Sequence, residues 1–510
     1  MEDNKLPLAV SVAVLLVVLC WRLIRPSLAT KPKLNLPPGP WTLPVIGSLH
    51  HLVSSPLLFR VLRGLAEKHG PLMMVRLGEV PALVASSVEA AQAILKTHDL
   101  SFADRFTPVT FATVAYGGTD LILSPYGERW RQLRKIVVQE MLTATRVKTY
   151  KHIRQEEVAR FLRVMAASAA AGTAVDFSRG FSKFINDAFV RECVGSRCKY
   201  QDEYLDAVHK ATQLASGVTL ADIYPSSRIM QMLATAPRKA LACRRRFDRI
   251  LKDIIQESKE AMECGDKTAH ESFVGVLLRL QKEGSTPIPL TNETIMALMF
   301  DMLAAGSDTS STTLTWAMTE LIRNPAAMAR AQAEVREAFK GKSIITEDDI
   351  AESGISYLKL VFKETLRLHP TSPLLIPRQC RETCQVMGYD IPKGTTVFVN
   401  IWAIGRNPLY WGDDAEEFKP ERFEANNLDF RGTNFEFIPF GAGRRMCPGI
   451  NLGLANMELA LASLLYHFDW KLPKGMEPKD VEVMEAVGIN GSKATSLLLH
   501  PVTFIPPAVE

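Results

Sequence analysis

A single cysteine near the C-terminus stands in a stretch that favours chemistry at its sulfur. From Phe440 to Gly449 the chain reads Phe-Gly-Ala-Gly-Arg-Arg-Met-Cys-Pro-Gly. The glycines, Gly441 among them, let the backbone turn tightly and approach a flat partner closely. A haem iron is one of the few partners that takes a single cysteine thiolate, and Arg445 can reach an anionic haem propionate from its place two residues before Cys447. We interpret Cys447 as a candidate haem ligand, and an inert cysteine in a glycine-rich loop is the alternative.

A second stretch joins an acid to a hydroxyl in the middle of a long helical pattern. The pattern runs from Thr291, a predicted N-cap, to Arg323, and residues 304–309 read Ala-Ala-Gly-Ser-Asp-Thr. Splitting a bound dioxygen requires protons delivered into a dry pocket, and Asp308 beside Thr309 is the simplest relay. Gly306 weakens the helix by about 1 kcal/mol, and the hydroxyls can bond back to carbonyls. A bend within a core is therefore the alternative interpretation.

Two further pairs stand at helical spacing. Trp130 and Arg134 lie four residues apart on one face of a predicted helix, a pair that alone could serve only packing. Glu364 and Arg367 lie three apart on another, as many exposed ion pairs do. Arg422, in a Pro-Glu-Arg-Phe run, could complete a buried network with that second pair.

Taken in order, these motifs resemble those of the cytochrome P-450 family of haem-thiolate monooxygenases, across essentially the whole chain. They are similar to the plant microsomal A-type branch, near grass members that oxidise terpenoid hydrocarbons. The resemblance implies that Cys447 binds the iron of haem b, that Thr309 holds a water on the oxygen side, and that Asp308 relays protons. On the same resemblance, the remaining haem-binding residues are Phe440, Gly441, Arg445, Trp130, Arg134 and Arg378. The implied substrate-pocket residues are Ala304, Ala305, Leu374, Leu375 and Val487, and the implied structural network is Glu364, Arg367 and Arg422.

The elements that must position these residues are mainly helical. From residue 88 onward the apolar spacing is mostly that of helices, and Pro71 to Val84 predicts a hairpin in a small β region. We expect residues 105–123 and 207–233 to be mobile covers, which the resemblance places over the pocket, and residues 257–270 to form a solvated loop. The length of 510 residues alone suggests two to four domains. The resemblance implies instead one large α-rich domain of the P-450 fold with a small β region.

The N-terminus predicts a membrane anchor. Leu6 to Trp21 is uncharged and almost entirely apolar, and basic residues follow it. A cleaved signal peptide is the alternative, but it would carry its positive charge before the apolar run. The positive-inside rule predicts that the N-terminus faces the lumen and the catalytic domain the cytosol. The resemblance to microsomal members implies a single-pass protein of the endoplasmic reticulum membrane. We divide the chain into an anchor (1–30), a basic, proline-rich hinge (31–47) and a catalytic domain (48–510).

Composition excludes several other classes of protein. The formal net charge is only +5, and no basic run is interleaved with aromatic residues in the manner of a nucleic-acid-binding face. The eight cysteines show no zinc-like or disulfide-dense spacing. No Gly-x-Gly-x-x-Gly fingerprint for a flavin or dinucleotide is present. Electrons must therefore come from elsewhere, and the resemblance implies NADPH and a separate flavoprotein reductase, with cytochrome b5 as an additional partner.

The resemblance implies hydroxylation of a lipophilic metabolite, in one or successive steps, and favours a sesquiterpene or diterpene as that metabolite. A phenolic, alkaloid or fatty-acid-derived substrate is an alternative for the same fold. A reductase-independent haem-thiolate isomerase or dehydratase is another, although it would not need Asp308 and Thr309. A non-catalytic haem or ligand-binding module is the third.

Overall fold

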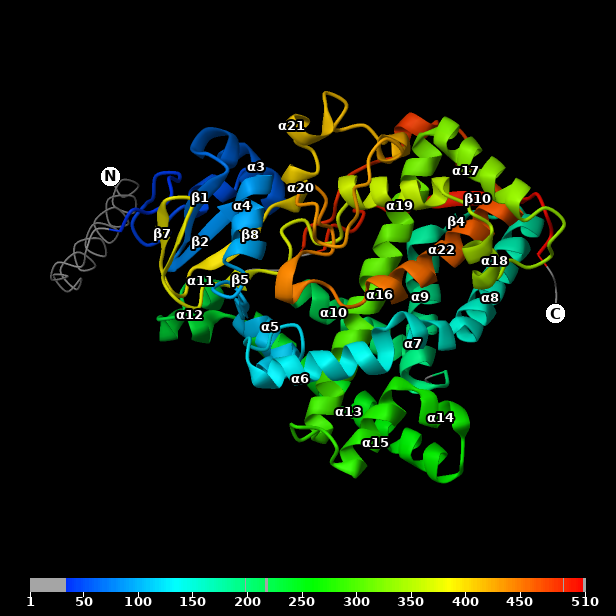
Figure 1. Ribbon diagram of the computed structural model, residues 1–510, viewed down its shortest axis with the longest axis horizontal. Coiled ribbons are helices and arrows are strands. Elements are labelled where there is room, and N and C mark those ends of the chain that lie inside the picture. The colour runs from blue at the N-terminus through cyan, green and yellow to red at the C-terminus, as the bar shows by residue number, and fades with distance from the viewer. Residues whose placement is uncertain (1–33, 198, 216–218, 489, 508–510) are drawn as a thin grey trace, which may run out of the picture.

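The computed structural model describes residues 34–507 except residues 198, 216–218 and 489. A small β-rich part adjoins the N-terminal end, and a larger helical body makes up the rest (Figure 1). The predicted anchor, residues 1–30, lies outside the described residues. Within the described ranges, no helix is both long enough and apolar enough to cross a membrane.

Helices dominate the described chain, as the apolar spacing predicts. The α-helices are α2 (Leu49–Leu52), α3 (Leu58–His69), α4 (Val88–Gln92), α5 (Val109–Val114), α6 (Glu128–Val137), α7 (Ala144–Thr149), α8 (Lys151–Ala171), α9 (Phe177–Val194), α10 (Gln201–Ala215), α11 (Leu220–Ile223), α12 (Arg228–Leu233), α13 (Ala236–Glu263), α14 (Lys267–Glu271), α15 (Phe273–Glu283), α16 (Asn292–Arg323), α17 (Pro325–Ala338), α18 (Glu347–Glu352), α19 (Tyr357–Leu368), α20 (Ile401–Ile404), α21 (Pro408–Trp411) and α22 (Ile450–His467). Short π-helical or 3-10 segments are η1 (Ala93–Thr97), η2 (Tyr116–Gly118), η3 (Val138–Leu142), η4 (Pro420–Phe423), η5 (Gly443–Arg445) and η6 (Pro478–Asp480).

Three small sheets complete the fold. Their strands are β1 (Leu72–Leu77), β2 (Val80–Ala85), β3 (Asp104–Arg105), β4 (Val175–Asp176), β5 (Arg378–Gln379), β6 (Cys384–Val386), β7 (Tyr389–Ile391), β8 (Thr396–Val399), β9 (Phe468–Lys471) and β10 (Leu498–Thr503). The largest sheet has the order β1-β2-β8-β5-β3, in which only the β2–β8 pair is parallel. The predicted hairpin is confirmed, since β1 and β2 pair antiparallel around Gly78.

The proline-rich segment before the domain is fastened to this sheet where the structure describes it. The Asn35 backbone N–H donates to the Asp390 carboxylate over 2.9 Å. The Pro38 carbonyl accepts from the Met74 N–H over 2.8 Å, which ties the segment to β1. Residues 34–47 therefore run along the β-rich part and do not stand away from it.

The long helix α16 forms as its sequence predicts. Thr291 is its N-cap, and the threonine side chain accepts a hydrogen bond from the Thr294 N–H. The helix ends at Arg323, before Pro325, because a proline cannot continue the hydrogen-bond ladder. Most of its residues from Thr294 to Ile322 are buried. The exception is the stretch 304–309, in which only Ser307 is buried. A helix that is buried all round belongs to the centre of a large core, and α16 crosses the helical body in this way (Figure 1).

The prediction of a solvated loop over residues 257–270 is wrong. Helix α13 continues to Glu263, and α14 follows from Lys267 to Glu271. The charged residues occupy the solvent face of an amphipathic helix, while Ile254, Ile255 and Ser258 lie buried on the other face. A run of charges therefore marked one face of a helix and not a loop.

Candidate active site

The loop that carries Cys447 is closed by its own backbone. The Cys447 N–H donates to the Phe440 carbonyl over 2.9 Å, so the two ends of the motif meet. Gly443 has a φ of +69°, and a side chain there would overlap the Leu95 carbonyl and the Asp99 carboxylate. The Gly-rich sequence is thus required for the close approach of this loop to η1.

The Cys447 sulfur faces an internal cavity. The side chain of Cys447 has exposed surface, and this surface lines the cavity inside the protein. Burial raises the pKa of the Cys447 thiol, and a backbone hydrogen bond from Gly449 and the charge of Arg134 partly oppose this. A thiol held in this way becomes a thiolate when it binds a metal ion, because metal ligands must be deprotonated.

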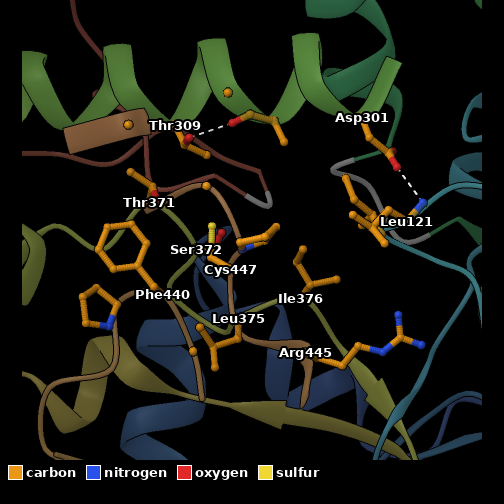
Figure 2. Close-up of a pocket in the computed structure, with 18 of the residues that line it drawn as sticks. Leu121, Asp301, Thr309, Thr371, Ser372, Leu375, Ile376, Phe440, Arg445 and Cys447 are labelled. Carbon is orange, nitrogen blue, oxygen red and sulfur yellow. Dashed lines mark hydrogen bonds between the residues drawn. The ribbon is translucent and has the colours of Figure 1, made fainter. Parts of the chain in front are cut away.

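The cavity lies between the cysteine loop and α16. Figure 2 shows Thr309 of α16 on one side and Cys447, Leu375 and Ile376 on the other. The volume open to the centre of a water molecule is about 250 Å³. Aliphatic and aromatic side chains provide much of the lining, so the cavity suits a largely apolar ligand.

Four arginines gather at one side of this cavity: Arg105, Arg134, Arg378 and Arg445. Burial and the charges of the other three lower the pKa of Arg105 well below its usual value. Burial and Arg378 lower the pKa of Arg445 to about 10. Arg378 is paired with Asp99 over 2.7 Å, but the Arg445 Nη1 atom is buried without a hydrogen-bond partner. So dense a cluster of guanidinium groups fits an anionic ligand.

The chemistry of the cavity therefore fits haem. Haem requires one axial ligand, a broad apolar space and cations for two propionates; Cys447, the apolar lining and the arginine cluster match each requirement. Of the four arginines, Arg105 was not singled out from the sequence. The register of β3 against β5 places it opposite Arg378, and no local motif signals that pairing.

Trp130 and Arg134 lie together on α6, as their spacing predicts. The Trp130 indole N–H donates to the Leu121 carbonyl over 3.0 Å, and Arg134 donates to the Met446 carbonyl over 2.6 Å. The two guanidinium groups of Arg134 and Arg445 lie 5.4 and 4.3 Å from the indole centroid. The pair thus ties α6 to the cysteine loop and to the segment around Leu121, and both residues line the cavity.

The centre of α16 presents only part of its motif to the cavity. Thr309 and Ala305 line it, and the Thr309 hydroxyl donates to the Ala305 carbonyl over 2.7 Å. Ala304 packs against the core instead. Asp308 is not among the lining residues; its carboxylate accepts a hydrogen bond from the Asn490 amide.

Gly306 has a packing reason in addition to its conformational freedom. A side chain at this position would overlap the ring of Phe189 on α9. Helix α16 remains helical through Gly306, so the predicted weak point does not interrupt it. The glycine therefore permits close contact between α9 and α16 beside Thr309.

The expected substrate-pocket residues divide into two groups. Leu374 and Leu375 line the cavity, as does Ile376. Val487 does not, and it is 68% exposed. The C-terminal loop meets the rest of the protein through Gly491 instead, whose N–H donates to the Thr371 carbonyl over 3.1 Å. An isolated antiparallel β-bridge joins Glu485 and Lys493, and Val487 lies exposed between them in the chain.

The two covers that we expected contribute unequally. Residues 105–123 supply Arg105, Leu121 and Ile122 to the cavity. The described residues of 207–233 supply none. Helix α10 packs against α13 and α5 instead, and the residues around α11 pack against the β1–β2 hairpin, where the Glu79 N–H donates to the Ile223 carbonyl over 2.8 Å.

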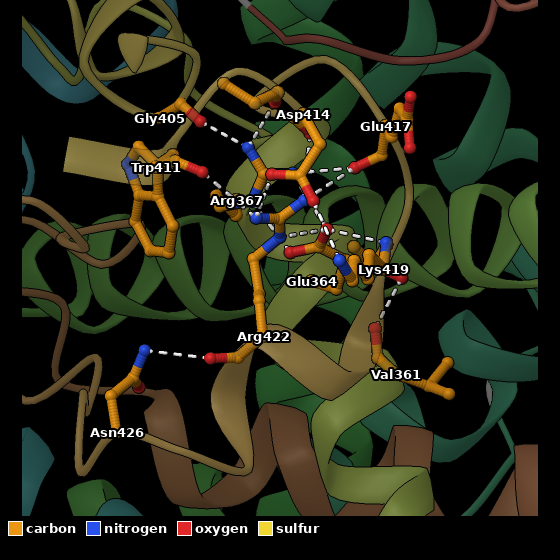
Figure 3. Close-up of polar contacts among 12 residues, drawn as sticks. Val361, Glu364, Arg367, Gly405, Trp411, Asp414, Glu417, Lys419, Arg422 and Asn426 are labelled. Atoms are coloured by element: carbon orange, nitrogen blue, oxygen red, sulfur yellow. Dashed lines mark hydrogen bonds and ion pairs between the residues drawn. The ribbon is translucent and has the colours of Figure 1, made fainter. Parts of the chain in front are cut away.

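Glu364 and Arg367 form a buried network with Arg422 (Figure 3). Arg367 meets the Glu364 carboxylate through two hydrogen bonds of 2.7 and 2.8 Å, and Arg422 meets it over 2.8 Å. The side chains of Glu364 and Arg367 are 0% exposed, and that of Arg422 is 8% exposed. Arg367 also bonds to the Gly405 and Ala415 carbonyls. The network thus fastens α19 to the chain that leads into the cysteine loop.

The chain belongs to the cytochrome P-450 family. The model of that family matches residues 37–498. A zebra fish cytochrome P-450 solved with abiraterone shares the fold, with a TM-score of 0.73 at 24% identity over 88% of this chain and 99% of that one. The fold class, mainly helical with small sheets, is confirmed.

Curated relatives from grasses resemble the chain along its whole length. Zealexin A1 synthase and dolabradiene monooxygenase of Zea mays are each 63% identical to it, over 99% of this chain and 99% of theirs. Ent-cassadiene hydroxylase of Oryza sativa subsp. japonica is 56% identical, over 100% of this chain and 99% of its own. The protein is a haem-thiolate monooxygenase with a haem cofactor, and a separate reductase supplies its electrons.

Proposed function

We propose that the protein hydroxylates a sesquiterpene or diterpene hydrocarbon, by one oxidation or by successive oxidations at one carbon. The observation that carries this proposal is the apolar cavity between Cys447 and Thr309, with Leu374, Leu375 and Ile376 along one wall. Such a lining binds a hydrocarbon skeleton by shape. The names of the relatives support the substrate class, since dolabradiene, ent-cassadiene and ent-isokaurene stand in the names of three of them.

In this proposal Cys447 binds the haem iron, and haem supplies the binding and activation of dioxygen. Arg445, Arg105 and Arg378 hold the propionates, with Trp130 and Arg134 beside them, while Phe440 and Gly441 shape the loop next to the sulfur. The Thr309 hydroxyl already donates to the Ala305 carbonyl, so its oxygen remains able to accept a hydrogen bond from a water in the cavity.

Asp308 supplies protons to that water from the side of the C-terminal loop. Its carboxylate is held by Asn490 and is turned away from the cavity. A short side-chain movement would bring the acid to the cavity and return it, which is the requirement for a proton relay in a dry site.

We also propose that the protein is anchored in the endoplasmic reticulum membrane by residues 1–30, with residues 31–47 as hinge and residues 48–510 as the catalytic domain facing the cytosol. The exposed apolar side chains of α12 support this. Ile229, Met232 and Leu233 are 68%, 72% and 63% exposed, and Trp41 is 63% exposed. Large exposed apolar side chains mark surfaces that meet a partner or a lipid phase. Helix α12 lies at the same end of the molecule as strands β1 and β2 (Figure 1).

A flotation assay tests this membrane assignment. The full chain is expected to float with microsomal vesicles, and a chain that lacks residues 1–30 is expected to float in part, through α12. Replacing Ile229, Met232 and Leu233 by aspartate in the shortened chain should abolish the remaining flotation. If the full chain stays in the soluble fraction, the anchor is refuted.

NADPH-cytochrome reductase is the proposed electron donor, and cytochrome b5 is proposed as an additional one.

The proposed activity is tested in two stages. The first measures the difference spectrum of the reduced, carbon-monoxide-bound protein in membranes, for the wild type and for Cys447→Ala. A strongly red-shifted Soret band that is lost in the variant is expected. Without that band in haem-supplied wild type, the thiolate ligation is refuted.

The second stage supplies reductase, NADPH and a panel of hydrocarbons that stand in the names of relatives: dolabradiene, ent-cassadiene, ent-isokaurene, premnaspirodiene and 5-epiaristolochene. A hydroxylated product that depends on NADPH and takes its oxygen from labelled dioxygen is expected from at least one of them. Conversion that needs no NADPH would point to an isomerase or dehydratase. Turnover confined to phenolic, alkaloid or fatty-acid-derived substrates would refute the terpenoid assignment.

A further inference from the structure

Two buried carboxyl groups meet where the segment 119–123 lies against α16. Asp120 is 0% exposed and Asp301 is 4% exposed. The Leu121 N–H donates to Asp301 Oδ2 over 2.6 Å, a bond shown in Figure 2, and the Leu123 N–H donates to Asp120 Oδ2 over 3.1 Å. One oxygen of each carboxyl group is therefore used to hold the backbone of this segment.

The other oxygen of each group has no donor. Asp120 Oδ1 and Asp301 Oδ1 are buried, and neither accepts a hydrogen bond from an N–H or O–H of the described residues. Leu121 follows Asp120 directly in the chain and its N–H reaches Asp301, so the two carboxyl groups lie close together. Two ionised carboxylates so placed repel strongly in a buried site, whereas a single proton between them satisfies both free oxygens.

We propose that Asp120 and Asp301 share one proton, and that this pair fastens the segment 119–123 to α16. Asp301, which itself lines the cavity, is then a positioning residue for the reaction. Leu121 and Ile122 of the segment line the substrate cavity, and Thr309 lies on the same helix as Asp301. The pair sets where those two apolar side chains stand relative to Thr309, and so which carbon of a bound substrate faces the reacting side.

Other contacts hold the segment to the haem side of the cavity. The Leu121 carbonyl accepts from Trp130, and the Ile122 carbonyl accepts from Arg105 over 3.3 Å. Directly after the segment, the Ser124 carbonyl accepts from Arg445. These contacts come from α6, β3 and the cysteine loop. The bond from Leu121 to Asp301 joins the segment instead to the helix on the oxygen side. The carboxyl pair therefore sets the distance between the segment and α16, which the contacts from α6, β3 and the cysteine loop do not set.

The charges around the pair agree with one retained proton at neutral pH. Burial is the main cause that raises the pKa of Asp120 to about 6, and the charge of Arg445 partly opposes it. Burial and the neighbouring Asp120 raise the pKa of Asp301 well above its usual value. Arg445 of the cysteine loop and Arg105 of β3 are the cations that face Asp120. The last proton of the pair should leave only as the pH rises above neutrality, after which two carboxylates face each other.

The test compares Asp301→Asn with Asp301→Leu in the haem-loaded, full-length protein. An asparagine can accept the Leu121 N–H and donate to an ionised Asp120, so it keeps the link without a shared proton. Leucine removes the link. The carbon monoxide difference spectrum of each variant shows whether haem and fold are retained.

The first readout is hydrogen–deuterium exchange of the peptide that contains Leu121 and Ile122, from about pH 7 to about pH 10. In Asp301→Leu its protection should fall at least about tenfold at every pH. In the wild type the protection of this peptide should equal that in Asp301→Asn near neutral pH and should fall below it as the pH rises. The second readout is the infrared band of a protonated carboxyl group, which should be present in the wild type and absent from Asp301→Asn.

Equal protection of wild type and Asp301→Asn across the whole pH range, or no carboxyl difference band, would overturn the shared proton. Should Asp301→Leu fail to bind haem, those two comparisons remain decisive. With a hydrocarbon that turns over, Asp301→Asn should keep the wild-type product ratio near neutral pH, and Asp301→Leu should change it at least about threefold. An unchanged product ratio in a folded Asp301→Leu variant would refute the positioning role. The exchange and infrared readouts need no substrate, so they stand apart from the proposed function.

Discussion

Removing the carboxylate of Glu364 should destabilise the whole protein. This carboxylate accepts hydrogen bonds from Arg367, from Arg422 and from the Lys419 N–H, the last over 2.8 Å. Glu364→Ala leaves the fully buried Arg367 without its counter-charge. Removing one partner of a buried ion pair is destabilising by about 3 to 5 kcal/mol, since the other charge stays behind unpaired.

The remaining contacts place the expected loss near the lower end of that range. Arg367 keeps three carbonyl acceptors, on Gly405, Ala415 and Glu417. Arg422 keeps the Asp414 carboxylate over 3.1 Å. The Lys419 N–H has no such substitute, and an unsatisfied backbone donor is unfavourable by about 1 to 3 kcal/mol. We therefore expect Glu364→Ala to lower the free energy of unfolding by about 3 kcal/mol.

Urea unfolding of the detergent-solubilised, haem-loaded enzyme measures this change, with the haem-thiolate absorption as the signal. Glu364→Gln keeps the size of the side chain and an acceptor, so it should fall between the wild type and Glu364→Ala. Glu128→Ala is the matched control, because Glu128 pairs with Arg131 at the same three-residue spacing on a helix surface, with side chains 62% and 55% exposed. It should leave the unfolding midpoint unchanged. A loss of less than about 1 kcal/mol in Glu364→Ala, similar to that of a surface pair, would refute this reasoning.

Three further outcomes are expected. Gly306→Ala should lower the free energy of unfolding by about 1 to 3 kcal/mol through overlap with the Phe189 ring, and adding Phe189→Leu should restore part of it; no recovery in the double variant would contradict this packing. Burial raises the pKa of Glu192 to about 7 in the folded protein from a usual 4.5, so its protonated form favours folding, and this contribution is lost as the pH rises through 7. Wild type should therefore lose stability relative to Glu192→Gln between about pH 5 and about pH 8, and parallel stability profiles would contradict this. Thr309→Ala should keep the carbon monoxide spectrum but lower the product formed per NADPH roughly tenfold, with peroxide in its place, and unchanged coupling would remove Thr309 from the proton path.

The sequence predicts those parts of the site in which the contacting residues lie close together in the chain. The loop from Phe440 to Gly449 brings its own ends together through a bond between Cys447 and Phe440. Glu364 and Arg367 meet because a helix places residues three apart on one face. In such cases local geometry decides which side chains meet, so spacing along the chain is enough to predict contact.

The parts that sequence reasoning missed depend on tertiary packing. Arg105 joins the arginine cluster through the pairing of β3 with β5, and its partner is 273 positions away in the chain at Arg378. Asp301 meets the segment 119–123 across a separation of 180 residues, as the bond to Leu121 shows. Val487 was expected in the pocket because the family resemblance implies it there, but its side chain is exposed and does not line the cavity. The resemblance places a loop at the pocket without stating which of its side chains turn inward.

The contacts of helix α16 determine which segments must be exchanged together when substrate specificity is transferred between related enzymes. Along its length it bonds to the segment 119–123 through Asp301, to the C-terminal loop through Asp308, and again to that loop through the Trp316 indole, which donates to the Gly491 carbonyl over 2.7 Å. A chimaera whose crossover separates this helix from either partner segment would combine surfaces that were not selected together. Residues 105–124, 292–323 and 485–491 therefore form one unit of exchange, and shuffled libraries that transfer the three together should yield more active enzymes than libraries that transfer any one alone.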